Sequence, residues 1–158
     1  MSVKTNAMRV LDQRKIAYKV HDYSPEIHSA VEAAQAMGKS PECVYKTLVV
    51  MRDLSPRAKP LLVMAPGDRE LDLRVLAKST GDKKLRMATQ KEAESLTGLL
   101  VGGIGALALL NRGFEIWIDA AAQAHERICV NAGQRGINLE LRVDDLVKVT
   151  GARWVEPA

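Results

Sequence analysis

The order of strand-like and helix-like segments constrains the fold of this chain more than any other feature. Apolar or alternating segments, typical of strands, are interspersed with short amphipathic segments, typical of helices, several of which end at glycine. The expected strands span 16–23, 44–51, 60–66, 83–88, 114–120, 126–133 and 137–143, and the expected helices span 3–11, 29–38, 72–81, 89–98 and 144–151. Because these segments do not form regular βαβ units, we expect a mixed α/β (α+β) fold with a curved, partly closed sheet, in a single domain over residues 1–158.

Capping residues and a polar turn support these boundaries. Ser29 precedes Glu32 by three positions, and Thr89 precedes Glu92 in the same way, which is the capping-box pattern. Asp144 or Asp145 is expected to cap the last helix. The polar segment 52–59 is expected to be the turn between the strands at 44–51 and 60–66.

The segment from Leu96 to Leu110 has 15 residues, no charge and four glycines. It is too short and too often interrupted to cross a bilayer, which needs about 20 apolar residues. No Lys-Ser/Thr pair follows the sequence GGIGAL, so the segment is not a phosphate-binding P-loop. The paired glycines, Gly102 and Gly103, either satisfy the conformation of a tight turn or allow a ligand to approach backbone N–H groups.

The composition excludes some partners and leaves others open. One Phe, two Trp and three Tyr are too few for a protein that binds a single strand by stacking many bases. A net charge of +4 is compatible with a nucleic-acid partner without identifying one. Residues 82–86, DKKLR, form either a solvated face or a patch that contacts phosphate.

Cysteine and histidine positions indicate neither disulfide nor metal chemistry. Cys43 and Cys129 are far apart and belong to no CxxC motif, so we expect two reduced, buried thiols. His21, His28 and His125 are scattered, so their spacing predicts no metal site. The N-terminal segment lacks the apolar run of a signal peptide. We therefore expect a cytoplasmic protein with no metal and no membrane segment.

Lys46 occupies an unusual position for a lysine. It lies within the apolar strand segment VYKTLVV, where it either extends from a sheet edge to solvent or points into a pocket. Thr47 should face the opposite side of a regular strand. The turn VNAGQRG at 130–136 is expected to be a hairpin connection. No Ser-His-Asp, Cys-His or paired-carboxylate arrangement can be inferred from spacing, so the residues alone name no reaction.

Three motifs together resemble the YbaK family of trans-editing proteins, which belongs to the superfamily of the prolyl-tRNA synthetase editing domain. These motifs are VYKTLVV at 44–50, TGLLVGGIG at 97–105 and CVNAGQRGINLEL at 129–141, and the segment HDYSPEIHSAVEAAQAMG at 21–38 also fits. The resemblance covers roughly residues 3–155. It implies a mixed, barrel-like sheet surrounded by short helices.

The resemblance also implies an activity, which is hydrolysis of a mischarged aminoacyl-tRNA without a cofactor or metal. The implied substrate is Cys-tRNA(Pro) or another small amino acid on tRNA(Pro), and the implied partners are aminoacyl-tRNA and prolyl-tRNA synthetase. Lys46 takes the catalytic role by resemblance. The implied substrate-binding residues are Tyr23, Thr47, Gly102, Gly103, Ile104, Asn131 and Asn138.

In this scheme, N–H groups of the loop at 102–106, here called the glycine loop, polarise the ester carbonyl while Lys46 stabilises the developing negative charge. In Cys-specific relatives the thiol of the substrate attacks its own ester, whereas another amino acid needs a positioned water. Two alternatives stay open. Cys129 or Cys43 is a nucleophile, or the chain is a catalytically weak relative that binds an aminoacyl or nucleotide ligand or a partner synthetase.

The chain departs from the family pattern around the expected amino-acid pocket. Gly105 and Ala106 stand where members usually have Ser-Pro, and Asn131 and Ala132 replace Ser-Gly. Asn138 replaces an aspartate that is common in Cys-specific members. Without the proline ring we expect a looser loop, and hence altered or relaxed discrimination among small amino acids.

Overall fold

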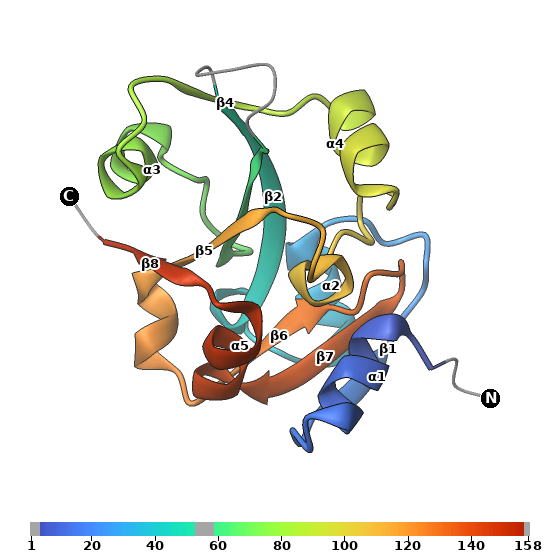
Figure 1. The fold of residues 1–158 in the computed structure, drawn as a ribbon. Coiled ribbons are helices and arrows are strands. Elements are labelled where there is room, and N and C mark those ends of the chain that lie inside the picture. The colour runs from blue at the N-terminus through green and yellow to red at the C-terminus, as the bar shows by residue number, and fades with distance from the viewer. Residues whose placement is uncertain (1–3, 53–58, 157–158) are drawn as a thin grey trace.

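The structure, a computed structural model, describes residues 4–52 and 59–156 (Figure 1). Among these residues, eight strands form one sheet: β1 (Lys19–Asp22), β2 (Val44–Arg52), β3 (Leu61–Pro66), β4 (Leu85–Met87), β5 (Glu115–Asp119), β6 (Arg127–Asn131), β7 (Ile137–Arg142) and β8 (Arg153–Val155). The α-helices are α1 (Asn6–Gln13), α2 (Ala30–Met37), α3 (Leu73–Thr80), α4 (Gln90–Thr97) and α5 (Val143–Thr150). Three 3-10 helices are also present: η1 (Pro41–Cys43), η2 (Ala106–Leu109) and η3 (Ala120–Ala124).

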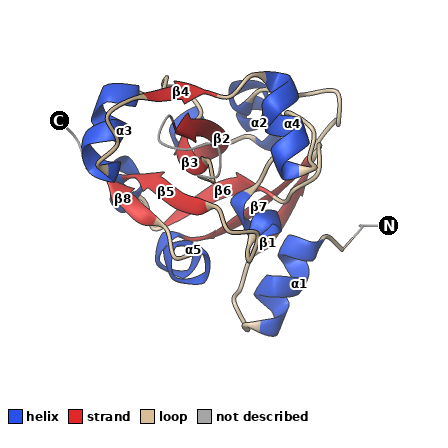
Figure 2. Cartoon of the chain, turned by 45° about the horizontal axis from the view of Figure 1, so that its top comes forward, coloured by secondary structure: helices blue, strands red, loops and turns tan. Residues whose placement is uncertain are grey.

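The sheet is mixed, as the sequence predicted, and the short helices lie around it. Its strand order is β1-β7-β6-β2-β3-β5-β8, and β4 pairs with β2 outside this path. The pairs β2–β6, β3–β5 and β5–β8 are parallel, and the others are antiparallel. Figure 2 shows α3 and α4 on either side of β4, away from α1 and α5.

Both faces of the central strands are covered. Alternate residues of four strands belong to the main buried cluster: Tyr45, Val49, Leu62, Met64, Ile128, Val130, Leu139 and Leu141. On the other face, Val44 and Cys129 pack with Ala34 of α2 in a separate cluster. Burial on both faces explains why the sequence around Lys46 is a nearly continuous apolar run rather than an alternating one.

The pairing of β2 leaves a gap along one of its edges. β3 pairs with residues 45–50 of β2 along the first edge. Along the second edge, β6 pairs with Val44 and Tyr45, and β4 pairs with 50–52. Within the described residues, no strand continues this second edge between the two partners, at 46–49. The gap lies in the middle of the sheet, where an unpaired edge is unusual for a central strand.

The predicted capping residues of α2 and α4 are in place. Thr89 and Glu92 form a complete capping box on α4, because each side chain binds the backbone N–H of the other residue. At α2, the Ser29 hydroxyl oxygen accepts from the Glu32 N–H at 3.1 Å. Both helices end at a glycine in the left-handed conformation, as the sequence indicated.

The C-terminal elements differ from the prediction. Arg142 is the N-cap residue of α5 and makes no side-chain capping bond, so the prediction that Asp144 or Asp145 caps this helix was wrong. Both aspartates lie in the first turn, where their charge still favours the helix N-terminus. β8 and the 3-10 helices were not predicted, because three to five residues carry no readable period.

Two expectations fall outside the described residues, namely the helix start at Val3 and most of the turn at 52–59. In the parts of the chain that are described, no helix combines the length and the apolar character needed to cross a membrane.

Candidate functional site

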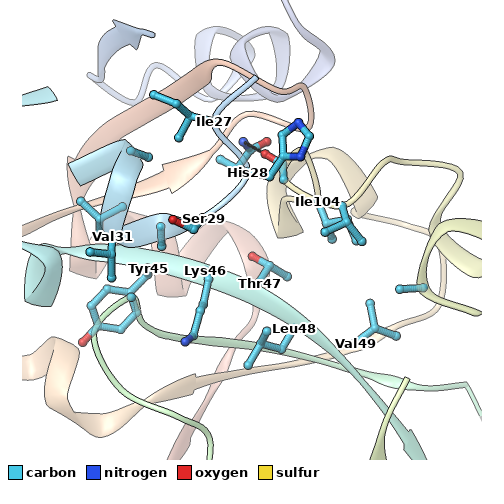
Figure 3. A pocket seen from close by; sticks show the side chains of 18 of the residues that line it. Ile27, His28, Ser29, Val31, Tyr45, Lys46, Thr47, Leu48, Val49 and Ile104 are labelled. Carbon is cyan, nitrogen blue, oxygen red and sulfur yellow. Dashed lines mark hydrogen bonds between the residues drawn. The ribbon is translucent and has the colours of Figure 1, made fainter. Parts of the chain in front are cut away.

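A cavity of about 460 Å³ opens at the gap in the β2 edge. It is lined by residues 44–49 of β2, by the segment that leads into α2, by the connection between β4 and α4, and by the glycine loop (Figure 3). The structure brings seven of the eight predicted site residues to this cavity: Lys46, Tyr23, Thr47, Gly102, Ile104, Asn131 and Asn138. Gly103 is not among the lining residues.

Thr47 directs backbone groups to the gap. On the β4 side the Val49 carbonyl accepts from the Ala88 N–H at 3.0 Å, and on the β3 side the Val44 carbonyl accepts from the Gly67 N–H at 2.8 Å. Because successive strand residues turn their N–H and C=O groups to alternate edges, those of Thr47 point to the same edge as those of Val49. Thr47 therefore offers one donor and one acceptor to the cavity.

The glycine loop reaches the cavity through Gly102. This residue has φ of +90°, and an added Cβ would lie 3.0 Å from the Cα of His28, so both the conformation and the close approach require glycine. The Gly103 N–H donates to the Leu100 carbonyl at 2.7 Å. The amide of Gly103 is thus used within the loop, which leaves Gly102 as the member of the pair that faces a ligand.

The turn after β6 clamps the glycine loop. The Asn131 side chain donates from Nδ2 to the Gly102 carbonyl at 3.0 Å, and its Oδ1 accepts from the N–H groups of Gly133 and Gln134 at 2.6 and 3.0 Å. Arg135 Nε donates to the Val101 carbonyl at 2.7 Å. The sequence argument missed Arg135, although it lies within the quoted motif CVNAGQRGINLEL.

Gly105 lies in close contact with the same turn. A Cβ at this position would overlap the Asn131 carbonyl oxygen and lie 3.1 Å from the Gly133 nitrogen. Ala106, the next residue, is buried. Glycine at 105, where the family usually has serine, is therefore matched by tight packing between the glycine loop and this turn. The sequence alone did not reveal this packing.

Tyr23 and Asn138 form a polar pair in the wall of the cavity. Asn138 Nδ2 donates to the Tyr23 hydroxyl oxygen at 2.7 Å. Burial raises the pKa of Tyr23, and hydrogen bonding with Asn138 and Asn131 opposes this rise. Asn138 is 3% exposed, and its Oδ1 has no hydrogen-bond partner among the described residues. A buried acceptor without a partner is costly, so this atom is suited to receive a donor from a ligand.

Lys46 is a lining residue of the cavity, and its amine is hydrogen-bonded to a neighbouring loop. Lys46 Nζ donates to the Arg69 carbonyl, in the loop after β3, at 2.7 Å. In Figure 3 the amine points away from His28 and Ile104. Contact with a ligand in the cavity requires rotation of this flexible side chain away from Arg69. The catalytic role of Lys46 stays a prediction.

The two thiols lie outside the cavity lining. Burial raises the pKa of Cys129 to about 12 and also raises the pKa of the half-buried Cys43. The Cys43 Sγ lies 3.6 Å from His125 Nδ1. Since a nucleophilic cysteine needs thiolate character and access to the substrate, the structure gives no support to either thiol as a nucleophile.

One group of metal-capable side chains escaped the spacing argument. His21 Nε2 lies 2.8 Å from Glu140 Oε1, and the ligand atoms of His21, Glu140 and Cys129 lie within 4.8 Å of one another. Lys39 Nζ binds the same Glu140 oxygen at 3.0 Å. Burial opposes ionisation of Glu140, but hydrogen bonds from His21 and Lys39 lower its pKa. We interpret the group as an ion-paired cover over the Cys129 thiol.

Comparison with known proteins places this site in a family. Residues 24–149 match the family model described as aminoacyl-tRNA editing domain. The chain is 34% identical over 155 residues to the "Putative Cys-tRNA(Pro)/Cys-tRNA(Cys) deacylase EbsC" of Enterococcus faecalis, covering 97% of this chain and 92% of that protein. It is also 31% identical over 98 residues to a proline--tRNA ligase of Aquifex aeolicus, covering 62% of this chain and 16% of the ligase.

A solved structure agrees with these sequence matches. The "Crystal structure of a putative trans-editing enzyme for prolyl tRNA synthetase" has a TM-score of 0.80 and 26% identity, and the match covers 98% of each chain. The family match includes every lining residue of the cavity except Tyr23, which directly precedes the matched range. The resemblance inferred from the motifs is therefore confirmed: the chain belongs to the aminoacyl-tRNA editing domain family.

Proposed function

We propose that this protein, as one domain over residues 1–158, is an aminoacyl-tRNA deacylase that removes misattached amino acids in trans. The observation that carries the proposal is the cavity in which the open edge of β2 lies beside the glycine loop, within a chain of the editing family. We further propose tRNA(Pro) as the carrier, prolyl-tRNA synthetase as the partner that releases it, and the cytoplasm as the location. Relatives named for Cys-tRNA(Pro) and for proline ligation support this choice.

The donor and acceptor of Thr47 suit an aminoacyl ester. The ester carbonyl can accept from the Thr47 N–H or from the Gly102 N–H, and such a bond strengthens as negative charge develops on the oxygen during attack. Once the Lys46 amine leaves the Arg69 carbonyl, it can add positive charge near the same ester oxygen. These groups hold and polarise the ester, so the protein needs to supply no covalent nucleophile.

The attacking group then comes from the substrate or from water. A cysteinyl ester carries a thiol that can attack its own carbonyl to give a thiolactone and free the ribose hydroxyl, and confinement in the cavity favours this intramolecular step. An alanyl or seryl ester lacks the thiol and requires a water in the cavity. We therefore expect the cysteinyl ester to react fastest, with slower hydrolysis of the other two.

The test is a panel of tRNA(Pro) molecules charged with Cys, Ala or Ser. Deacylation of Cys-tRNA(Pro) should exceed the rate without protein by at least tenfold, and the Ala and Ser esters should be hydrolysed more slowly. Failure to deacylate any of the three would contradict the proposal. Binding of a non-hydrolysable aminoacyl-adenosine amide in the same experiment would then favour the ligand-binding alternative.

Asn138 provides a second prediction, because its Oδ1 is the buried acceptor in the wall. We infer that this atom binds the α-ammonium group, which every aminoacyl ester carries. Asn138→Asp should therefore lower KM for the Cys, Ala and Ser esters alike, by several-fold, since hydrogen bonds to a charged acceptor are about twice as strong. A change confined to the Cys ester would show that Asn138 contacts the amino-acid side chain instead.

A further inference from the structure

The mouth of the cavity carries exposed apolar side chains. Among the described residues, the large hydrophobic side chains that are exposed are Val31 (38%), Met87 (40%) and Leu100 (55%). Val31 and Met87 line the cavity, and Leu100 stands next to Val101, which also lines it. Exposed apolar residues that gather at a cavity mouth, rather than being scattered over the surface, indicate a binding surface.

The chain segment beside this mouth carries an excess of positive charge. Asp82 is buried and pairs with Arg52 at 3.0 Å, and Glu92 pairs with Arg86 at 2.8 Å, so both acids are neutralised. Three lysines of the same segment are exposed and form no ion pair within the described residues: Lys83, Lys84 and Lys91. The third acid of the segment, Glu94, accepts from the Val101 N–H at 2.9 Å. The three lysines are therefore available to an anionic partner.

Met87 and the three lysines lie close together along the chain. Met87 ends β4, and Lys84 precedes it by three residues, which is roughly 10 Å along an extended chain. Lys91 lies in the first turn of α4 and follows Gln90, which lines the cavity. Figure 2 shows β4 along the outer edge of the molecule between α3 and α4.

We propose that this surface, made of Val31, Met87, Lys83, Lys84 and Lys91, holds the single-stranded 3′ end of the aminoacyl-tRNA. The inference rests on the proposed function and adds where the nucleic acid lies. The terminal adenine packs on the exposed apolar side chains of Val31 and Met87. The phosphates of the preceding nucleotides follow the lysines, and such contacts position the strand without reading its sequence.

The experiment compares two variants that lose the same charge. One combines Lys83→Ala, Lys84→Ala and Lys91→Ala. The control combines Arg14→Ala, Arg127→Ala and Lys148→Ala, which removes exposed cations just after α1, in β6 and in α5, all outside the cavity lining. Each is measured on mischarged tRNA(Pro) and on the matching aminoacyl ester of adenosine, which has no phosphate.

The lysine variant should lose at least tenfold in kcat/KM on the tRNA and keep its rate on the adenosine ester. The slope of log kcat/KM against log salt should become shallower by about 2, since each single-strand phosphate contributes about 0.7. The control variant should stay within threefold of wild type on both substrates. An unchanged salt slope in the lysine variant would overturn the inference.

The adenine contact is tested separately with Met87→Ser. KM for the adenosine ester should rise three- to tenfold, while hydrolysis of a simple aminoacyl methyl ester, which has no base, should not change. Equal KM values for variant and wild type would remove Met87 from the surface. If the wild-type protein hydrolyses neither the tRNA nor the adenosine ester, the proposed function itself fails, and this inference fails with it.

Discussion

Gly105→Ser is expected to lower the free energy of unfolding by about 1–3 kcal/mol and to reduce deacylation at least tenfold. The added Cβ would overlap the Asn131 carbonyl oxygen and lie 3.1 Å from the Gly133 nitrogen, so loop and turn must separate. Separation would pull Gly102 away from Asn131, whose Nδ2 now binds the Gly102 carbonyl. Urea unfolding and a deacylation assay with Cys-tRNA(Pro) measure the two effects.

Gly38→Ala is the control for Gly105→Ser, because Gly38 is needed only for its backbone conformation. Gly38 ends α2 with φ of +69°, and a Cβ there would meet nothing within 4 Å. Its replacement should cost about 1 kcal/mol of stability and leave deacylation unchanged. If Gly105→Ser behaves like Gly38→Ala, the loop has room to accept the family residues, and packing does not explain their absence.

Lys46→Ala should lower kcat/KM for deacylation of the aminoacyl-tRNA by at least tenfold, which corresponds to about 1.4 kcal/mol of lost transition-state stabilisation. The loss should fall mainly on kcat, because the amine is expected to act on charge that develops during attack. Folding should persist, because within the described residues the Lys46 amine makes a single hydrogen bond, to the Arg69 carbonyl, in a half-buried position. Circular dichroism and thermal unfolding check this.

Cys129→Ser serves as the companion to Lys46→Ala. Its side chain lies outside the cavity lining, and its raised pKa keeps the thiol protonated, so we expect wild-type turnover within twofold. Loss of activity on serine substitution would revive the thiol nucleophile. Wild-type turnover in Lys46→Ala would remove Lys46 from the mechanism, whatever the result for Cys129.

The sequence predicted the element types well, but it did not predict how the strands pair. Periodicity located the strand around Lys46 and the helices that begin at Ser29 and Thr89, because local burial and caps leave a local pattern. It carried no information that β2 would share its second edge between β6 and β4. That arrangement depends on contacts between residues 33 to 85 positions apart, which no local window records.

The site residues were found for a related reason. The motifs around Lys46, Gly102 and Asn131 are short and contiguous, so comparison with a family could identify them. The hydrogen bond from Arg135 to Val101 and the close packing of Gly105 depend on contact between the glycine loop and the turn after β6, which are distant in the sequence. Spacing arguments also missed the group of His21, Glu140 and Cys129, because neighbouring strands rather than sequence neighbours bring these side chains together.

The interruption in the pairing of β2 has a consequence for self-association. A long unpaired edge invites a strand from another molecule and is a common origin of aggregation. Among the described residues, the unpaired stretch amounts to the two backbone groups of one residue, Thr47, bounded by β6 on one side and β4 on the other. A β-strand from another molecule needs several consecutive backbone hydrogen bonds to dock, and the groups of one residue are too few for this. A ligand with a single polar unit the size of an amide can bind both groups. The protein can therefore keep an unpaired edge inside its sheet without promoting aggregation.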